Sequence, residues 1–151
     1  MFKSLKLFFG FLALLVATQV ASAGDQVPFS LEASATSLTT PVFVGTHMFL
    51  TASGSGKASH LGAITFTAPH DFDLVNGTYV SNAFVRAANG DILHLVTLGQ
   101  FINAVDSIGT WTAVGGTGRF AGATGSGTAL NLNFGASITF TGTISSVGSG
   151  H

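Results

Sequence analysis

Apolar and polar residues alternate along most of this chain, and that two-residue period is the feature that most restricts its fold. Residues 136–145, ASITFTGTIS, place Ile138, Phe140 and Ile144 on one face and mostly Ser and Thr on the other. Residues 128–134, TALNLNF, repeat the pattern. Successive side chains of a β-strand point to opposite faces, whereas an amphipathic helix needs a period of 3.6. The chain is therefore predicted to be all-β.

Turn-forming residues divide the alternating runs. Asn76-Gly77 and Asn89-Gly90 mark tight hairpins, because Asn and Gly tolerate the positive φ of a type I′ turn. Pro41 and Pro69 mark strand entries or edges. Eight strands are predicted, over residues 27–36, 42–53, 57–68, 76–88, 91–102, 107–115, 120–132 and 135–147. Short connections favour a closed eight-stranded antiparallel up-and-down barrel, since closure removes exposed edges.

The first 23 residues have the order of a secretory signal peptide. Lys3 and Lys6 precede an apolar stretch over residues 7–17, and the small residues Ala21-Ser22-Ala23 follow. A helix of this length is too short for a bilayer core of about 30 Å. We expect cleavage after Ala23 and export to the periplasm or out of the cell. A single barrel domain over residues 24–151, with no membrane span after cleavage, is then expected.

Charge is scarce in the expected mature chain. Lys57, Arg86 and Arg119 are its only formal cations and stand against six acids, which leaves a formal charge of −3 with histidine neutral. Nucleic-acid binding needs a basic patch that displaces counterions, so this class is excluded. The sequence has no cysteine. Stability must therefore come from packing and a closed hydrogen-bond ladder rather than from disulfides.

Residues 115–128, GGTGRFAGATGSGT, include GTGRFA, which matches a dinucleotide-binding fingerprint. That fingerprint holds a pyrophosphate only where a strand precedes it and a helix follows. A strand-like alternating run follows here instead. The stretch is predicted to be a hairpin whose glycines supply positive φ and let the strands bend.

The same hairpin resembles a motif of a known superfamily. GGTGRFAGATGSG is similar to the GGTG-x-F-x-x-A/V-x-G hairpin of the allene oxide cyclase and dirigent barrels, and more closely to small secreted bacterial proteins of that type. HLGAIT at 60–65 and AANGD at 87–91 resemble further motifs of the secreted group. The resemblance implies an eight-stranded barrel with a central cavity. Such barrels often form trimers, and some members cyclise hydrophobic substrates or steer their coupling.

Polar residues that share a strand face with bulky apolar ones are the candidate ligand-binding residues. A barrel of this size is either filled by side chains or holds one small ligand, and a few polar groups in an apolar pocket are typical of such a site. Alternation places five candidates in the barrel interior: His47, Asn82, Arg86, His94 and Gln100. For each, the alternative is a satisfied core residue or a rim residue.

Glu32, the only glutamate, is a candidate acid through the resemblance, because allene oxide cyclases use an early-strand glutamate inside the barrel. Alternation groups it instead with Ser30 and Ser34, opposite Phe29 and Leu31. The resemblance and the alternation therefore disagree on where this side chain lies.

No metal site or cofactor is predicted. His70-Asp71-Phe72-Asp73 has acids at i and i+2, like part of a calcium loop, but the remaining ligands are missing. A solvated turn after Pro69 is expected there. The histidines show no zinc-binding spacing.

Three functions stay open. The first is a secreted barrel that binds a small apolar molecule in its central cavity. The second is a cyclase-like or dirigent-like enzyme acting on a hydrophobic substrate, with catalytic residues not identified. The third is a packed structural or surface barrel without a ligand. An apolar-lined cavity would support the first two, and a filled interior would support the third.

Overall fold

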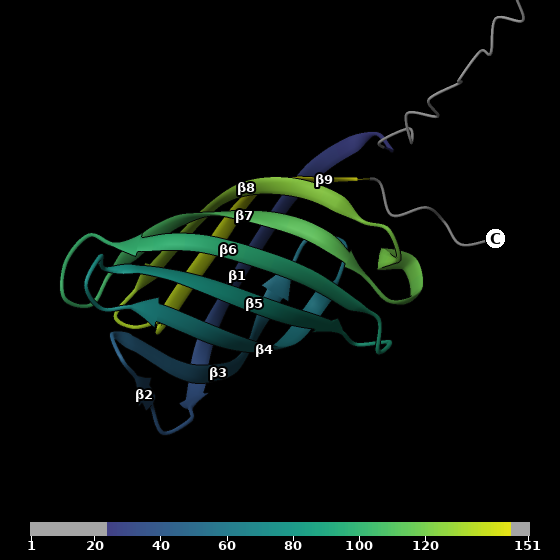
Figure 1. Ribbon diagram of the computed structural model, residues 1–151. Coiled ribbons are helices and arrows are strands. Elements are labelled where there is room, and N and C mark those ends of the chain that lie inside the picture. The colour runs from purple at the N-terminus through teal and green to yellow at the C-terminus, as the bar shows by residue number, and fades with distance from the viewer. Residues whose placement is uncertain (1–23, 146–151) are drawn as a thin grey trace, which may run out of the picture.

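The computed structural model describes residues 24–145, which form a closed antiparallel β-barrel (Figure 1). Neighbouring strands follow the order β1-β9-β8-β7-β6-β5-β4-β3-β2, and β1 also pairs with β3 to close a barrel of eight strands. The short β2 pairs with the first residues of β3, outside the closed sheet. In chain order the elements are β1 (Gln26–Leu38), β2 (Val42–Val44), β3 (His47–Ala58), β4 (Gly62–Asp73), β5 (Thr78–Ala87), β6 (Ile92–Phe101), β7 (Ser107–Gly116), the 3-10 helix η1 (Gly118–Phe120), β8 (Thr124–Leu132) and β9 (Ser137–Ser145).

The predicted signal peptide, residues 1–23, lies outside the described residues. Within residues 24–145, no helix has the length and hydropathy that crossing a membrane requires. The closed eight-stranded antiparallel barrel confirms the predicted fold class, with β2 as an addition that the sequence did not suggest.

Two predicted strands were displaced along the chain. β3 and β4 each lie five residues further on than expected, because the turn between them falls at Ser59–Leu61. Gly54 and Gly56 look like turn residues but lie within β3, where β1 approaches closely. A side chain at either position would collide with a backbone carbonyl of β1. These glycines therefore close the barrel rather than end a strand.

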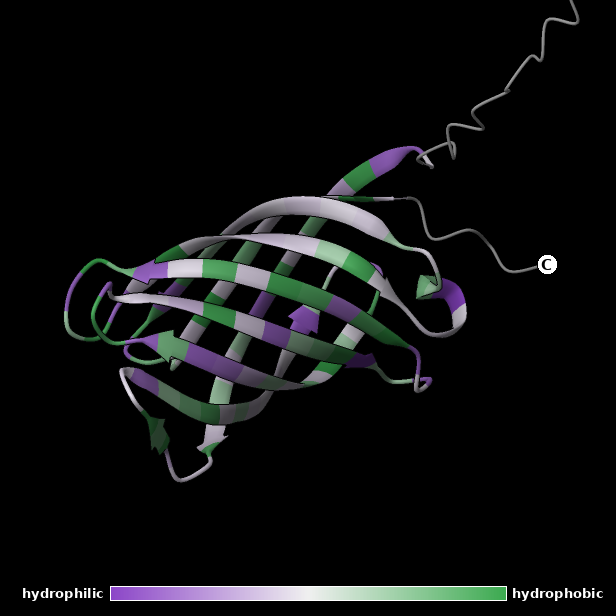
Figure 2. Ribbon diagram, in the orientation of Figure 1, coloured by the Kyte–Doolittle hydropathy of each residue, from purple (hydrophilic) through white to green (hydrophobic). Residues whose placement is uncertain are grey.

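Buried and more exposed residues alternate along the strands, so that successive side chains point into the barrel and outward. The ribbon shows hydrophobic and hydrophilic residues alternating along several strands (Figure 2). On β6, for example, Leu93, Leu95 and Thr97 are buried inside, while His94 and Val96 lie between them on the outer face. The outer face is not uniformly polar, and several of its bulky apolar residues are well exposed. Because both faces of several strands carry apolar residues, alternation predicts the strands but does not by itself identify the inward face.

One half of the interior, which we call the packed half, is filled by large side chains. Trp111 is fully buried, and its ring lies edge-on to Phe29 at a centroid distance of 5.2 Å and parallel to Phe140 at 6.2 Å. The indole N–H donates to the carbonyl oxygen of Thr141, at 3.2 Å. Phe120 of η1 is also fully buried in this core. The packed half lies at the end of the barrel where β1 begins (Figure 1).

The glycine-rich stretch forms the connection between β7 and β8, as predicted, although β8 begins later than expected, at Thr124. η1 is one 3-10 turn followed directly by a strand, so the helix that a dinucleotide fingerprint needs is missing after GTGRFA. Gly118 has a φ of 57°, and a side chain there would collide with the carboxylate of Asp91. Asp91 in turn lies 3.6 Å from Nε of Arg119 and ties the hairpin to the start of β6.

Candidate functional site

The other half of the interior, the cavity half, contains a cavity of about 140 Å³. It lies towards the end of the barrel formed by the β6–β7 and β8–β9 connections, opposite η1 (Figure 1). Within the described residues, no Asp, Glu, Lys or Arg lines it. Its wall is mostly apolar and includes Leu31, Ala33, Leu50, Ala52, Phe66, Ala68, Ala83, Val85 and Phe140.

The cavity exists because the inward side chains are small at this level of the barrel. Ala52, Ala68, Ser81 and Ala83 lie side by side on the inward face of the adjacent strands β3, β4 and β5. These short side chains do not reach the opposite wall of the barrel, so space remains in front of them.

His70 lies in the cavity wall, on β4. Its ring stacks on Phe72 at 5.3 Å and lies 5.8 Å from the ring of Tyr79. Nδ1 lies 2.7 Å from the carbonyl oxygen of Ala68. A carbonyl can only accept, so Nδ1 carries the hydrogen of this bond. Burial lowers the pKa of His70 below its ordinary value, and the bond to Ala68 opposes that effect. A neutral ring leaves Nε2 as an acceptor.

The predicted solvated turn over His70–Asp73 was wrong, because β4 continues through Pro69 to Asp73. Pro69 pairs with Thr51 of β3, and the ladder between β4 and β5 has a gap at this point. A residue without an N–H is tolerated where the ladder is interrupted. The signal for this was present in the sequence, since Phe66, Ala68, His70 and Phe72 keep the two-residue period across the proline.

Tyr79, Ser107 and Asn131 form a polar patch on the wall. Nδ2 of Asn131 donates to Oη of Tyr79 at 2.8 Å, and Oη lies 3.2 Å from Oγ of Ser107. Tyr79 lies on β5, Ser107 on β7 and Asn131 on β8. Ser107 and Asn131 are side by side because they pair across the two neighbouring strands. Gly99 of β6 leaves room for the tyrosine ring, which a side chain there would strike. The patch satisfies most of its own hydrogen bonds.

Thr97 differs from that patch because its hydroxyl has no partner. The residue is 2% exposed and lines the cavity, and no described residue forms a hydrogen bond with Oγ1. Leaving a buried hydroxyl unsatisfied costs about 1–3 kcal/mol. Nothing in the sequence points to this residue, because a threonine between Val96 and Leu98 is unremarkable in a strand.

Four of the predicted interior residues lie on the outer face, so their placement was wrong. On β5 the buried residues include Ser81, Ala83 and Val85, and on β6 they include Leu95 and Thr97. The residues between them, which point outward, are the candidates Asn82, Arg86, His94 and Gln100.

The reason for this error is that both strands carry bulky apolar residues on the outer face. On β5, Phe84 is 41% exposed, while small Ser81 and Ala83 point inward. On β6, Leu98 is 58% exposed although Leu93 and Leu95 are buried, so apolar residues alone do not identify the inward face. His94 stacks on Phe84 with ring centroids 4.5 Å apart and places Nε2 3.3 Å from Oδ1 of Asn82. These side chains form an outer cluster rather than a binding pocket inside the barrel.

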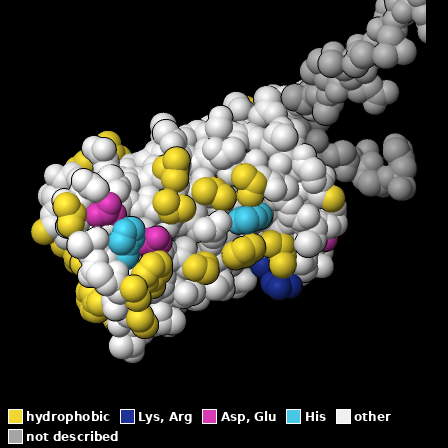
Figure 3. Space-filling model, viewed as in Figure 1, with side chains coloured by type: hydrophobic (Ala, Val, Ile, Leu, Met, Phe, Trp, Pro, Cys, Tyr) yellow, Lys and Arg dark blue, Asp and Glu magenta, His cyan; other side chains and the backbone are white. Residues whose placement is uncertain are grey.

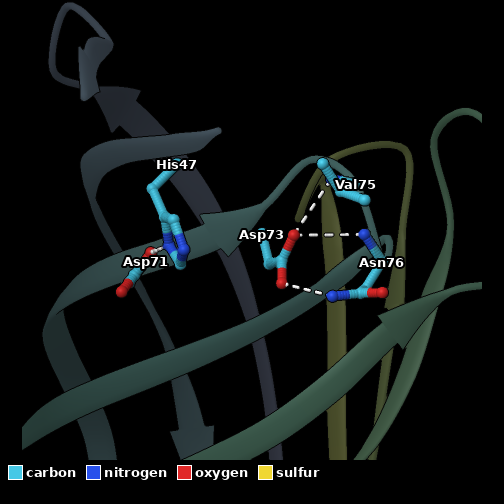
Figure 4. A network of polar contacts seen from close by, with 5 residues as sticks. All are labelled: His47, Asp71, Asp73, Val75 and Asn76. Carbon is cyan, nitrogen blue, oxygen red and sulfur yellow. Dashed lines mark hydrogen bonds and ion pairs between the residues drawn. The ribbon is translucent and has the colours of Figure 1, made fainter. Parts of the chain in front are cut away.

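His47 also lies on the outer face, at the start of β3, and not inside. Its Nδ1 is 2.6 Å from Oδ1 of Asp71 (Figure 4), and the hydrogen bond to Asp71 raises the pKa of His47. Phe43 of β2 pairs with Met48 and lies on the opposite face from His47.

Two further acids were considered as site residues, Asp73 as part of a calcium-loop pattern and Glu32 as an acid inside the barrel. Asp73 accepts from the side chain of Asn76 and from the backbone N–H groups of Val75 and Asn76 (Figure 4), and the bond from the Asn76 side chain lowers the pKa of Asp73. Glu32 is exposed on the outer face of β1, where alternation placed it. The interior role that the resemblance implied for Glu32 does not fit this position. Residues 24–145 contain no group of three or more metal-ligating side chains that could hold an ion.

No protein family, curated protein or solved structure matches this chain. The geometry of the cavity therefore carries the functional argument.

Proposed function

We propose that this protein is an exported barrel that binds a small apolar molecule in the cavity half. The observation that carries the proposal is an uncharged, apolar-walled cavity of about 140 Å³ that contains an unpaired hydroxyl at Thr97. Apolar pockets with a few polar groups are the usual form of small-molecule sites. The eight-stranded antiparallel closure also supports an allene oxide cyclase-like or dirigent-like barrel, and the order of residues 1–23 supports export.

The test is a thermal-stability screen of small apolar molecules against three proteins. Ala83→Leu places three extra carbons in the cavity, while Ala63→Leu makes the same change at an exposed position of β4. A ligand at a hundred times its Kd stabilises the folded state by about 2.7 kcal/mol. We expect stabilisation of the wild type and Ala63→Leu but not of Ala83→Leu. If no compound stabilises the wild type, a structural barrel without a ligand becomes the better interpretation.

A cyclase-like or dirigent-like enzyme is the second candidate, and His70 is the observation that favours it. A neutral imidazole in an apolar cavity is suited to act as a general base. Turnover of a hydrophobic substrate that disappears in His70→Gln, while binding of that substrate persists, would support the enzyme over the binding protein.

We also propose self-association through the outer face of β5 to β8. Val80 pairs with Leu98, and Ile108 pairs with Leu130, and all four are exposed. Several groups of apolar side chains lie on this face among uncharged surface, with few charged side chains between them (Figure 3). Contiguous exposed apolar surface is typical of protein interfaces.

Sedimentation equilibrium tests this self-association. Leu98→Glu should shift the protein towards monomer, and Ser34→Glu on the outer face of β1 should not. A wild type that is monomeric at high micromolar concentration would rule the association out.

A further inference from the structure

The proposed function leaves the chemistry of the ligand open, and two polar groups of the cavity wall restrict it. The first is the hydroxyl of Thr97, which is buried and lacks any partner among the described residues. A hydroxyl can both donate and accept. The ligand that relieves this unsatisfied group must therefore carry a hydrogen-bonding atom of its own.

The second group is the imidazole of His70. Its Nδ1–H is committed to the carbonyl of Ala68 at 2.7 Å. The neutral ring then offers Nε2 as an acceptor, directed away from Ala68. An acceptor of this kind binds an O–H or N–H group and gains nothing from an ether or a ketone.

Strand register places the two groups in one row across the wall. His70 pairs with Ser81 on β5, and Ser81 pairs with Thr97 on β6. Adjacent strands lie about 4.8 Å apart, and inward side chains converge towards the barrel axis. A ligand hydroxyl in front of Ser81 can accept from Thr97 and donate to His70.

Three of the remaining polar residues, Tyr79, Ser107 and Asn131, bond to one another at 2.8 to 3.4 Å and do not need a ligand in the same way. The hydroxyl of Ser81 lines the cavity within the row itself, between His70 and Thr97, and is neutral like them. No charged side chain of the described residues lines the cavity. A carboxylate or an ammonium group would therefore be buried without a counter-ion, which is strongly unfavourable.

We propose, on the basis of the binding function above, that the ligand is a neutral alcohol with an apolar body of about one ring, held by Thr97 and His70. The size follows from the volume. The cavity of about 140 Å³ is close to the engineered cavity of about 150 Å³ that binds one benzene in another protein. The apolar wall takes the ring, and the His70–Thr97 row takes the hydroxyl.

The experiment compares five probes of similar size by calorimetry at pH 8, where His70 is neutral: benzyl alcohol, its isomer anisole, toluene, benzoate and benzylamine. Benzyl alcohol should bind about tenfold more tightly than toluene, as expected for about 1.4 kcal/mol of net hydrogen bonding. Anisole should bind less tightly than benzyl alcohol, because its oxygen can accept from Thr97 but cannot donate to His70. Benzoate and benzylamine should not bind measurably.

Three variants then assign the preference to residues. Thr97→Val and His70→Phe keep the approximate shape of each side chain and should each reduce the ratio of benzyl alcohol to toluene affinity towards one. His94→Phe makes the same change at the histidine on the outer face and should leave the ratio unchanged. If either interior variant fails to fold, the comparison of benzyl alcohol with its isomer anisole on the wild type still decides the ligand class.

Each other outcome contradicts a different claim. Equal binding of toluene, anisole and benzyl alcohol would overturn the alcohol inference but leave the apolar-binding function standing. Tighter binding of benzoate or benzylamine than of benzyl alcohol would also overturn the alcohol inference. Binding by none of the five probes would overturn the binding function itself. A preference that persists in both interior variants would show that other residues hold the hydroxyl.

Discussion

The packed half and the cavity half of the barrel are built from the same eight strands but differ in their inward side chains. Large rings fill the packed half, whereas several small or polar residues line the cavity half. β6 passes through both halves. Leu93 and Leu95 at its start are fully buried against the aromatic core, whereas Thr97 and Gly99 further along border the cavity or the tyrosine ring that lines it. A single strand thus changes from hydrocarbon packing to polar lining within a few residues.

This difference separates close packing from open space along the barrel axis. Close-packed aromatic contacts in one half stabilise the whole closed sheet, because every strand of the barrel is paired with both of its neighbours. The other half is left free to contain empty space and an unsatisfied hydroxyl, both of which destabilise it. The following predictions test that separation.

The largest expected effect is that of Trp111→Ala in the packed half. Removing a fully buried indole should lower the free energy of unfolding by about 3–5 kcal/mol. Phe72→Ala, at the cavity wall, should cost less than half as much, because that ring is only partly buried. Urea unfolding of the two variants gives the comparison. Equal losses would mean that the two halves contribute equally to stability.

A smaller effect is expected at the hairpin that joins β7 to β8. Gly118 and Gly122 both have positive φ, but only a side chain at Gly118 would meet another group, the carboxylate of Asp91. Gly118→Ala should cost about 1–3 kcal/mol and Gly122→Ala about 1 kcal/mol, from backbone strain alone. Thermal unfolding measures both. Indistinguishable melting temperatures would show that the hairpin moves aside from Asp91.

Thr97→Val should have an effect of opposite sign. In the ligand-free protein, replacing the unpaired hydroxyl by a methyl group should stabilise the barrel by about 1 kcal/mol. Thr112→Val on the outer face of β7 is the matched control and should be nearly neutral. A loss of stability in Thr97→Val, measured in urea, would indicate that a bound water satisfies Oγ1.

The smallest expected effects concern the pH dependence of stability. His70 in the cavity wall and His47 on the outer face should change stability with pH in opposite directions. The folded-state pKa of His70 is lowered, so the unfolded chain binds more protons below about pH 6.5, and stability falls as the pH drops from there towards the folded-state pKa. The pKa of exposed His47 is raised by Asp71, so its contribution is present below about pH 6.5 and is lost as the pH rises through the folded-state pKa.

Melting temperatures between pH 5 and 8 separate these two contributions. His70→Phe should reduce the loss on the acid side, and His47→Gln should reduce the loss on the alkaline side. Identical pH profiles for wild type and His70→Phe would mean that the ring is solvated rather than buried.

Alternation and turn residues were enough to predict the closed barrel and the position of the turns at Asn76-Gly77 and Asn89-Gly90. The predicted type I′ geometry was wrong, because the two glycines have positive φ but Asn76 and Asn89 do not. The inward face of β5 was not predictable in the same way. Phe84 and Val80 on one face and Val85 and Ala83 on the other give two apolar sides. Choosing between them requires knowing that a narrow interior prefers the smaller set, which depends on the opposite strands.

The site was missed for related reasons. His70 follows a proline that suggested a turn, although the alternation from Phe66 to Phe72 continues across it. Thr97 is conspicuous only because its partner is missing, and that property belongs to the three-dimensional arrangement. Composition and spacing therefore predicted the wall of the barrel, whereas the space inside it emerged only from the packing of all eight strands.

The position of the chain ends has a practical consequence. Gln26 at the start of β1 pairs with Ser145 at the end of β9, so both leave the barrel beside the packed half (Figure 1). A fluorophore or affinity tag attached beside Gln26 or Ser145 would therefore lie at the opposite end of the barrel from the cavity. Attachment there would leave the proposed binding end accessible to the sample.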